Sequence, residues 1–233
     1  APAELRELMN RYYETLFGPI RLSGGIISDV VGDASLAIWT STQSDPVQRQ
    51  LACDAALEIL SSVEYFNQQQ PAHALPTRLG LHFGEVIMGH VGAMDHYEYR
   101  AVGDIVNTAS RIEGLNKQLG TRILVSKEVL EGVEGFITRE LGSFLLLGKS
   151  KPLSLYELVA KVHQDKNNKP YADFVRSLHM FQAQHWDEAS IGFENFIVKY
   201  GEDGPSQYYL DLCRQYLASP PAEWDGVIRV TKK

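Results

Sequence analysis

The stretch AVGDIVNTASRIEGLN, residues 101–116, predicts the end of a strand, a tight turn and a helix. Its Gly-Asp dipeptide is a turn signal, and apolar side chains recur after it at helical spacing. Asn107 and Arg111 are four residues apart, so their side chains project from one face of this helix. A fixed guanidinium can stabilise charge on a phosphoryl oxygen, and an amide beside it can orient a sugar. The alternative is a solvated helix start with Asn107 as its cap.

A second Gly-Asp dipeptide, Gly32-Asp33, joins the β-type runs IISDVV and ASLAIW. This is a hairpin signal, and it places Asp33 exposed at the tip. A carboxylate there is well placed to bind Mg²⁺, which prefers one or two carboxylates together with substrate phosphates. Gly-Asp is also a common tight-turn dipeptide, so the alternative is a turn with a structural role only.

The other elements follow from periodicity. Helices are expected over residues 2–20 and 46–69, where apolar residues recur at helical spacing. Residues 78–92 alternate like one strand, with glycines at which bulges or close backbone approach are expected. A strand, a short helix and two more strands are expected between residues 121 and 160. This order predicts an α+β fold, with helices on one face of a mostly antiparallel sheet.

A polar segment, VHQDKNNKP, predicts a linker and two domains, residues 1–164 and 165–233. Beyond it, three short amphipathic helices resemble a tetratricopeptide-type hairpin plus a capping helix. One such hairpin cannot bury its apolar face alone, so it should pack on the first domain, on a neighbour or on a partner. The ending SPPAEWDGVIRV, with Trp224, can dock back onto the body.

Composition limits the class of protein. The 233 residues carry a formal net charge of −7, and Lys and Arg are scattered, which argues against nucleic acid or an anionic membrane as the main partner. Cys53 and Cys213 are far apart, so neither a disulfide framework nor a zinc site is suggested, and a reducing cytoplasm fits. Because no apolar run approaches the roughly 20 residues that span a bilayer, any membrane attachment is expected outside this chain.

Three segments in order, GGIISDVVGDASLAIW, RLGLHFGEVIMGHVG and YRAVGDIVNTASRIE, resemble the catalytic core of the class III nucleotidyl cyclases, the adenylyl and guanylyl cyclase family. The resemblance runs from about residue 3 to residue 160 and implies the ferredoxin-like βαββαβ cyclase fold, followed here by a small α-helical hairpin extension. The C-terminal helices and PPAEWDGV resemble bacterial members in which the cyclase follows a membrane-anchored extracellular sensor. An upstream sensor and an inner-membrane anchor are therefore expected in the parent protein, with the cyclase in the cytoplasm.

The resemblance implies a role for each matched residue. Asp33 matches one of two aspartates that bind a pair of Mg²⁺ or Mn²⁺ ions, Asn107 matches the residue that holds the ribose, and Arg111 the one that holds the α-phosphate. It also implies a head-to-tail homodimer in which Asp33 of one chain faces Asn107 and Arg111 of the other. The implied reaction is in-line attack of the ribose 3′-oxygen on the α-phosphorus, with two metal ions assisting and pyrophosphate leaving.

The chain departs from the family at the first metal aspartate. The family's strand Phe-x-Asp-x-x-x-Phe-Thr is expected just before the helix at residues 2–20, and the sequence has no such segment. Asp33 is therefore the one matched metal carboxylate, and the chain is expected to be a fragment.

Two further departures concern the nucleotide. Adenylyl cyclases usually have Lys where this chain has Asp29, and Asp or Thr where it has Arg100. Asp29 could accept from guanine N1–H and N2–H₂ while Arg100 donates to O6 and N7, or the two could pair with each other. Leu147 stands at the family's triphosphate-binding Lys, with Lys149 two residues on. Lys149 or Lys151 could reach the phosphates, or both are solvated loop charges.

Two hypotheses follow. The first is a homodimeric cyclase that converts ATP, or GTP, into the 3′,5′-cyclic nucleotide and pyrophosphate in bacterial signal transduction, with ATP favoured. The second is a catalytically silent module that keeps the cyclase fold, dimerises and binds a protein partner. The altered metal, base and Lys positions favour the second, whereas the presence of both Asn107 and Arg111 favours the first.

Overall fold

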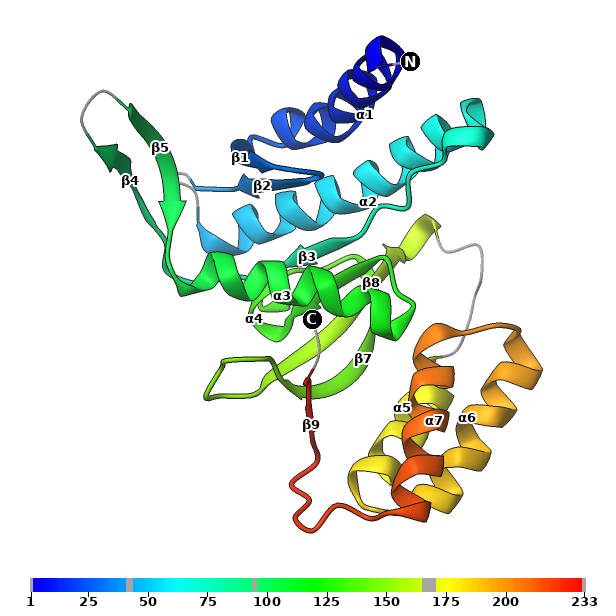
Figure 1. The fold of residues 1–233 in the computed structure, drawn as a ribbon. Coiled ribbons are helices and arrows are strands. Elements are labelled where there is room, and N and C mark those ends of the chain that lie inside the picture. Colours follow the sequence, from blue (N-terminus) through cyan, green and yellow to red (C-terminus); the bar gives the residue numbers. More distant parts are fainter. Residues whose placement is uncertain (1, 41–43, 94–95, 165–170, 232–233) are drawn as a thin grey trace. The chain divides into compact units, whose positions relative to one another are not determined.

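A computed structural model describes residues 2–40, 44–93, 96–164 and 171–231 (Figure 1). The chain forms two compact units, residues 1–77, 83–107 and 128–134 in the first, and residues 78–82, 108–127 and 135–233 in the second. Seven α-helices and nine strands occur in the described ranges, which confirms the α+β class.

The first unit joins two helices with two hairpins. α1 and α2 pack together, with the ring centroids of Tyr12 and Phe66 5.9 Å apart. The hydroxyl of Tyr12 lies 2.7 Å from that of Thr77, which ties α1 to the chain after α2. The bounds of four of these elements agree with the sequence-based expectations: α1 (Pro2–Leu22), β1 (Ile26–Val31), β2 (Ala34–Ile38) and α2 (Asp45–Gln69). The second hairpin consists of β4 (Ile87–Ala93) and β5 (His96–Val102).

The expectation of one strand over residues 78–92 is wrong. The structure has β3 (Leu79–Leu81) in the second unit and β4 in the first, with a bend at Gly84 between them. β3 lies directly on helix α3 (Asp104–Leu119), because a Cβ at Gly80 would fall 2.3 Å from the Glu113 nitrogen. Close backbone approach at Gly80 was expected and is confirmed. The strand that makes this approach is short, because the chain leaves it after Leu81 to form the hairpin that begins with β4.

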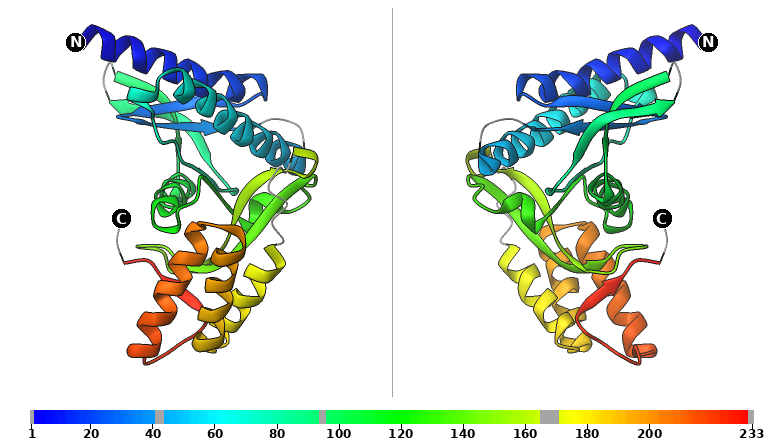
Figure 2. Two further views of the ribbon diagram at one scale, coloured as in Figure 1. Left: turned by 90° about the vertical axis from the view of Figure 1, so that its right-hand side faces the viewer. Right: turned by 90° about the vertical axis from the view of Figure 1, so that its left-hand side faces the viewer.

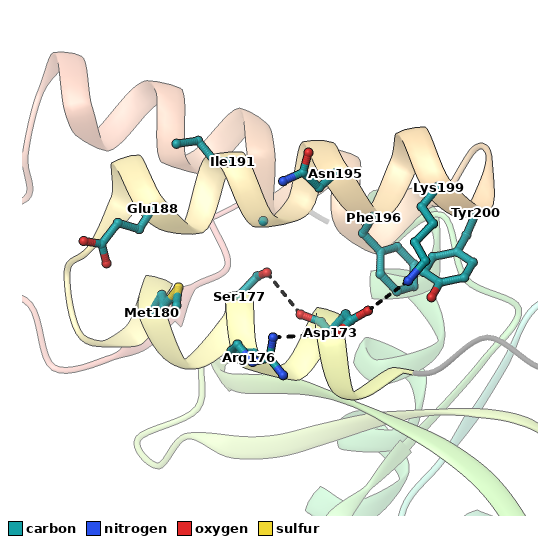
Figure 3. Close-up of a pocket in the computed structure, with 11 residues that line it drawn as sticks. Asp173, Arg176, Ser177, Met180, Glu188, Ile191, Asn195, Phe196, Lys199 and Tyr200 are labelled. Carbon is teal, nitrogen blue, oxygen red and sulfur yellow. Dashed lines mark hydrogen bonds and ion pairs between the residues drawn. The ribbon is translucent and has the colours of Figure 1, made fainter.

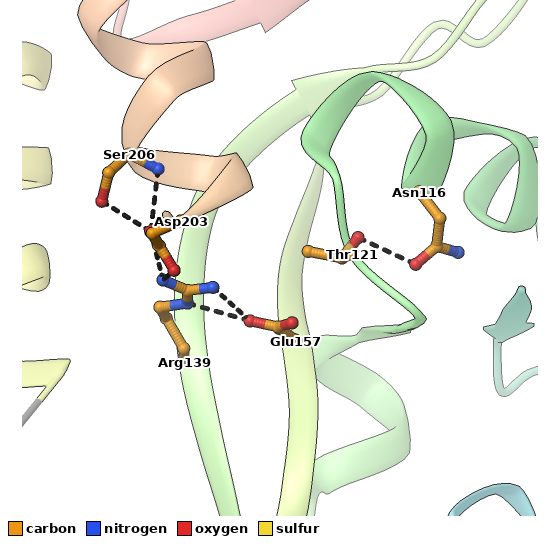
Figure 4. A network of polar contacts seen from close by, with 6 residues as sticks. All are labelled: Asn116, Thr121, Arg139, Glu157, Asp203 and Ser206. Carbon is orange, nitrogen blue, oxygen red and sulfur yellow. Dashed lines mark hydrogen bonds and ion pairs between the residues drawn. The ribbon is translucent and has the colours of Figure 1, made fainter. Parts of the chain in front are cut away.

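The second unit holds a five-stranded sheet with the order β3-β6-β8-β7-β9. Its strands pair antiparallel except at β3–β6 and β7–β9. The parallel β3–β6 pair needs a crossover, and α3 is part of that connection. Asn116 of α3 donates to the Leu79 oxygen at 2.9 Å and accepts from Thr121 at 2.8 Å, which fixes the helix end to the sheet edge (Figure 4). The remaining strands of this part are β6 (Ile123–Ser126), β7 (Phe136–Leu145) and β8 (Leu153–Lys161). Helix α4 (Lys127–Leu130) follows β6, and its residues after Lys127 belong to the first unit.

The C-terminal helices bury their apolar face on this sheet. α5 (Tyr171–Gln182), α6 (Trp186–Tyr200) and α7 (Gly204–Ala218) share one core with β7, in which Phe174, Phe181 and Tyr209 pack with Leu141 and Phe144. Figure 2 shows the three helices side by side and the chain returning from them to the sheet. The first domain, a neighbour and a partner were the three surfaces considered for the apolar face of these helices. In the structure this face packs on the sheet of the same chain. The boundary near residue 165 and the tetratricopeptide likeness stay predictions.

The C-terminal tail docks as expected. The indole nitrogen of Trp224 donates to the Gln182 oxygen at 2.8 Å, and β9 (Val227–Arg229) adds to the sheet parallel to β7. Cys53 and Cys213 are both free and buried, and burial raises the pKa of each thiol to about 12. Neither thiol therefore supplies a thiolate at neutral pH.

Candidate active site

The hairpin β1–β2 presents Asp33 at its tip, as the sequence predicted. Val31 pairs with Ala34, so Gly32 and Asp33 form a two-residue loop, and Gly32 has φ +64°. The Tyr13 hydroxyl donates to the Gly32 oxygen at 2.8 Å and holds the loop against α1. The Asp33 side chain is exposed, so it is free of packing and can meet a ligand.

The segments that carry Asp29 and Arg100 lie next to each other. The register of β1 shifts at Ser28, between Ile27 and Asp29, and the Ser28 hydroxyl oxygen accepts from the Ala101 nitrogen at 3.2 Å. This bond joins the residue before Asp29 to the residue after Arg100. Asp29 accepts from the Val30 nitrogen at 2.8 Å, while the side chain of Arg100 lies outside the described residues. The structure thus supports a common location for the two positions and leaves their pairing a prediction.

Helix α3 carries Asn107 and Arg111 one turn apart. The helix begins at Asp104, directly after Gly103, so Asn107 lies in its first turn, and the alternative in which Asn107 caps the helix is wrong. Asn107 is exposed, and Arg111 is half-buried. The four-residue spacing puts both side chains on one face, as expected from the sequence.

The guanidinium of Arg111 meets the turn between β7 and β8. A Cβ at Gly148 would lie 3.1 Å from Nη1 of Arg111, and the Lys149 nitrogen donates to the Leu146 oxygen at 3.0 Å to close this turn. The turn that carries Lys149 is thereby brought to Arg111. Nη1 is buried and has no hydrogen-bond partner among the described residues. Sequence reasoning missed Gly148, although its place in the Leu-Lys-Gly pattern was a signal that could have found it.

The predicted residues divide between the two units. Asp33, Asp29, Arg100 and Asn107 belong to the first, whereas Arg111 and Lys149 belong to the second. Helix α3 carries residues of both units, with Asn107 in its part of the first unit and Arg111 in its part of the second.

A groove of about 490 Å³ lies between α5 and α6, and none of the predicted site residues lines it (Figure 3). Its charged side chains pair with one another: Asp173 lies 3.6 Å from the Lys199 nitrogen and 3.8 Å from an Arg176 nitrogen. These pairs are exposed and contribute little to binding or stability. The groove therefore offers no constellation for the predicted chemistry.

In the described ranges, no helix is long and apolar enough to cross a membrane.

The sequence from residue 1 to residue 160 matches the family model described as the adenylate and guanylate cyclase catalytic domain. The chain belongs to this family. The cyclase domain is 35% identical over 166 residues to adenylate cyclase 1 of Rhizobium meliloti (strain 1021), a match that covers 70% of this chain and 25% of that protein. The chain thus spans about a quarter of the length of this curated relative.

Solved cyclase structures share the fold. The adenylyl cyclase CyaB from P. aeruginosa matches the chain with a TM-score of 0.61 and 26% identity, over 69% of this chain and 84% of that one. The guanylate cyclase domain of RhGC from Catenaria anguillulae, solved in complex with GTP, matches with a TM-score of 0.59 and 23% identity, over 69% and 86%. Cyclase domains of this family bind ATP or GTP and work as dimers.

Members of the cyclase family generally use divalent metal ions. Among the described residues of this cyclase domain, no group of three or more His, Cys, Asp or Glu side chains could hold an ion. Asp33, exposed at the hairpin tip, still fits an ion bound through one carboxylate and substrate phosphates, which is a common arrangement for Mg²⁺.

Proposed function

We propose that this chain is the catalytic module of a nucleotide cyclase that converts ATP into 3′,5′-cyclic AMP and pyrophosphate. The observation that carries the proposal is Arg111: its Nη1 is buried without a hydrogen-bond partner in the described ranges, on the same helix face as Asn107. A buried donor left unpaired costs about 1–3 kcal/mol, so a site with such a donor gains when an anion accepts from it. The α-phosphate of a nucleotide is such an acceptor.

In the proposed reaction the 3′-oxygen of the ribose attacks the α-phosphorus and forms the new O–P bond, while the bond from the α-phosphorus to the oxygen bridging to the β-phosphorus breaks. Pyrophosphate leaves with that oxygen, and the 3′-hydroxyl proton passes to water. Asn107 holds the ribose, and Arg111 stabilises the charge that grows on the α-phosphoryl oxygens. Lys149, on the turn that meets Arg111, binds the triphosphate. Divalent ions held in part by Asp33 supply charge neutralisation when they are bound.

The proposed enzyme is a head-to-tail homodimer. Asp33 of one chain faces Asn107 and Arg111 of the other, so each active site takes residues from two copies. The dimeric cyclase domains of the family support this part of the proposal. Its place in bacterial signalling, in the cytoplasm and behind a membrane-anchored sensor, is a prediction about the longer protein.

The name of the curated relative, an adenylate cyclase, supports ATP as the substrate. The acid at Asp29 favours GTP instead, so these two observations point to different nucleotides. The second candidate function, a silent cyclase-fold module that dimerises and binds a protein, is favoured by Asp29 and Arg100 at the base positions and by Leu147 at the position of the triphosphate-binding Lys.

A product assay separates the two functions. The chain is incubated with Mn²⁺ and either ATP or GTP, and the cyclic nucleotide is identified by chromatography. The cyclase proposal expects product, and it expects Arg111→Ala to lower kcat/KM by about 100-fold to 1000-fold, the usual loss when a donor to transition-state charge is removed. Arg214→Ala, at an exposed arginine on α7, is the matched control and should change turnover little. Equal turnover in both variants would exclude the proposed role of Arg111.

A further inference from the structure

The end of the Arg111 side chain lies against the backbone of Gly148. A Cβ built on Gly148 would lie 3.1 Å from Nη1, 3.3 Å from Nη2 and 3.6 Å from Cζ of Arg111. Because both terminal nitrogens are nearer than Cζ, the Cβ would meet the end of the guanidinium at which Nη1 and Nη2 project. A guanidinium binds a phosphate through two parallel hydrogen bonds along one of its edges, so the direction of this end decides how such a ligand is met.

These distances crowd any side chain at position 148. Contacts of 3.0–3.4 Å are tighter than nine in ten real Cβ contacts, so a methyl group there would push the guanidinium away by a few tenths of an ångström. Nη1 makes no hydrogen bond to any described residue. The position of Nη1 is therefore limited by packing against this turn and not by a hydrogen bond. The turn itself is closed by the bond from the Lys149 nitrogen to the Leu146 oxygen.

We propose that Gly148 is a positioning residue for Arg111. The missing side chain lets the β7–β8 turn close on the end of the guanidinium, and this contact sets the direction in which Nη1 and Nη2 point. The inference rests on the role of Arg111 proposed above. Because a misplacement of 1 Å can cost about 100-fold in rate, a shift of a few tenths of an ångström should lower kcat by about 3-fold to 10-fold.

The test must separate this contact from backbone strain. Gly148 has φ +68°, a conformation that alanine adopts at a cost wherever it stands. Gly135 has φ +82° and no heavy atom within 4 Å of a Cβ built on it. Gly135→Ala therefore carries the same kind of strain without the contact and is the matched control for Gly148→Ala.

The kinetic arm compares both variants in two backgrounds. With Arg111 in place, Gly148→Ala should lower kcat by about 3-fold to 10-fold, while Gly135→Ala stays within about 2-fold. In the background of Arg111→Lys, which removes the planar end of the side chain, Gly148→Ala should have no further effect beyond that of Gly135→Ala. Equal losses in the two glycine variants, or the same loss from Gly148→Ala in both backgrounds, would overturn the inference.

A second arm does not depend on turnover. The Nε–H resonance of Arg111 in an NMR spectrum of the chain is assigned by its disappearance in Arg111→Lys. Gly148→Ala should shift this resonance and Gly135→Ala should not, and an unmoved resonance in Gly148→Ala overturns the inference even when no product forms. Failure of the proposed function has a different signature, unchanged turnover in Arg111→Ala.

Discussion

Arg139 on β7 and Asp203 before α7 are 64 positions apart in the chain, yet Nη1 of Arg139 donates to both carboxylate oxygens of Asp203 at 2.8 Å (Figure 4). Arg139 also donates to Glu157 at 2.9 Å, and the rings of Tyr171 and Phe174 lie 4.9 and 4.8 Å from its guanidinium carbon. Asp203 in addition accepts from the Ser206 nitrogen at 3.0 Å, as the N-cap of α7. The pair thus joins the helical extension to the cyclase sheet.

Removing Asp203 should destabilise the chain strongly. The Arg139 side chain is 3% exposed and that of Asp203 6%, and breaking a buried pair costs about 3–5 kcal/mol because the remaining charge is left without its partner. Since Glu157 still neutralises Arg139 in part, we expect about 3 kcal/mol for Asp203→Ala in urea unfolding. Asp211→Ala, in an exposed pair with Arg214 on the same helix, is the control and should cost less than about 1 kcal/mol. Equal losses of unfolding free energy in the two variants would show that the buried pair does not stabilise the packing of the helical extension on the sheet.

The same pair predicts a pH dependence of stability. Burial by itself raises the pKa of Asp203, but the charge of Arg139 and the hydrogen bonds from Ser206 outweigh it and lower the pKa below the ordinary 3.8. A carboxyl whose pKa is lowered by folding contributes stability that is present above its unfolded pKa and is lost as the pH falls toward the folded value. The free energy of unfolding should therefore fall below about pH 4 through this group.

Unfolding free energies measured across this range for the wild type and for Asp203→Asn check the sign. The variant should be less stable at neutral pH and should lose less stability on acidification than the wild type does, because its amide does not titrate. Parallel pH profiles for the two proteins would assign the acid sensitivity to other carboxylates.

Two glycines near α3 should respond to alanine in opposite directions. A Cβ at Gly80 would lie 2.3 Å from the Glu113 nitrogen and 2.6 Å from the Ala109 oxygen, and backbone atoms cannot yield as a side chain can. Gly80→Ala should cost about 3 kcal/mol or more, at the upper end of overpacking penalties. Gly114, inside α3, has nothing within 4 Å of such a Cβ, so Gly114→Ala should stabilise by about 0.5–1 kcal/mol. Denaturant midpoints measure both, and a neutral Gly80→Ala would contradict the close packing of β3 on α3.

Gly80 also marks where prediction from sequence ends. The Gly32-Asp33 hairpin and helix α3 could be predicted because their signals, a turn dipeptide and helical spacing, lie within a few residues. The alternation of residues 78–92 also looked local, but β3 ends at Leu81, and the contact of Gly80 with Glu113 of α3 joins segments 33 positions apart, which no local pattern shows. The Arg139–Asp203 pair and the approach of Gly148 to Arg111 likewise join distant segments, so no local pattern announces them.

Asp29 should help to decide the nucleotide. The bond from the Ala101 nitrogen to the Ser28 hydroxyl oxygen joins the segments of Asp29 and Arg100, so a base bound there would meet both positions. Asp29→Lys replaces an acceptor with a donor, which suits the acceptors of adenine rather than the N1–H and N2–H₂ of guanine. We expect the ratio of ATP to GTP turnover to rise by about 10-fold or more, as for one bidentate contact worth about 1–3 kcal/mol. Glu14→Lys, at an exposed position on α1, makes the same change of charge away from these segments and should leave the ratio unchanged. A ratio that is the same in both variants would sink the base-reading role of Asp29, and the pairing of Asp29 with Arg100 would then be the better account of this acid.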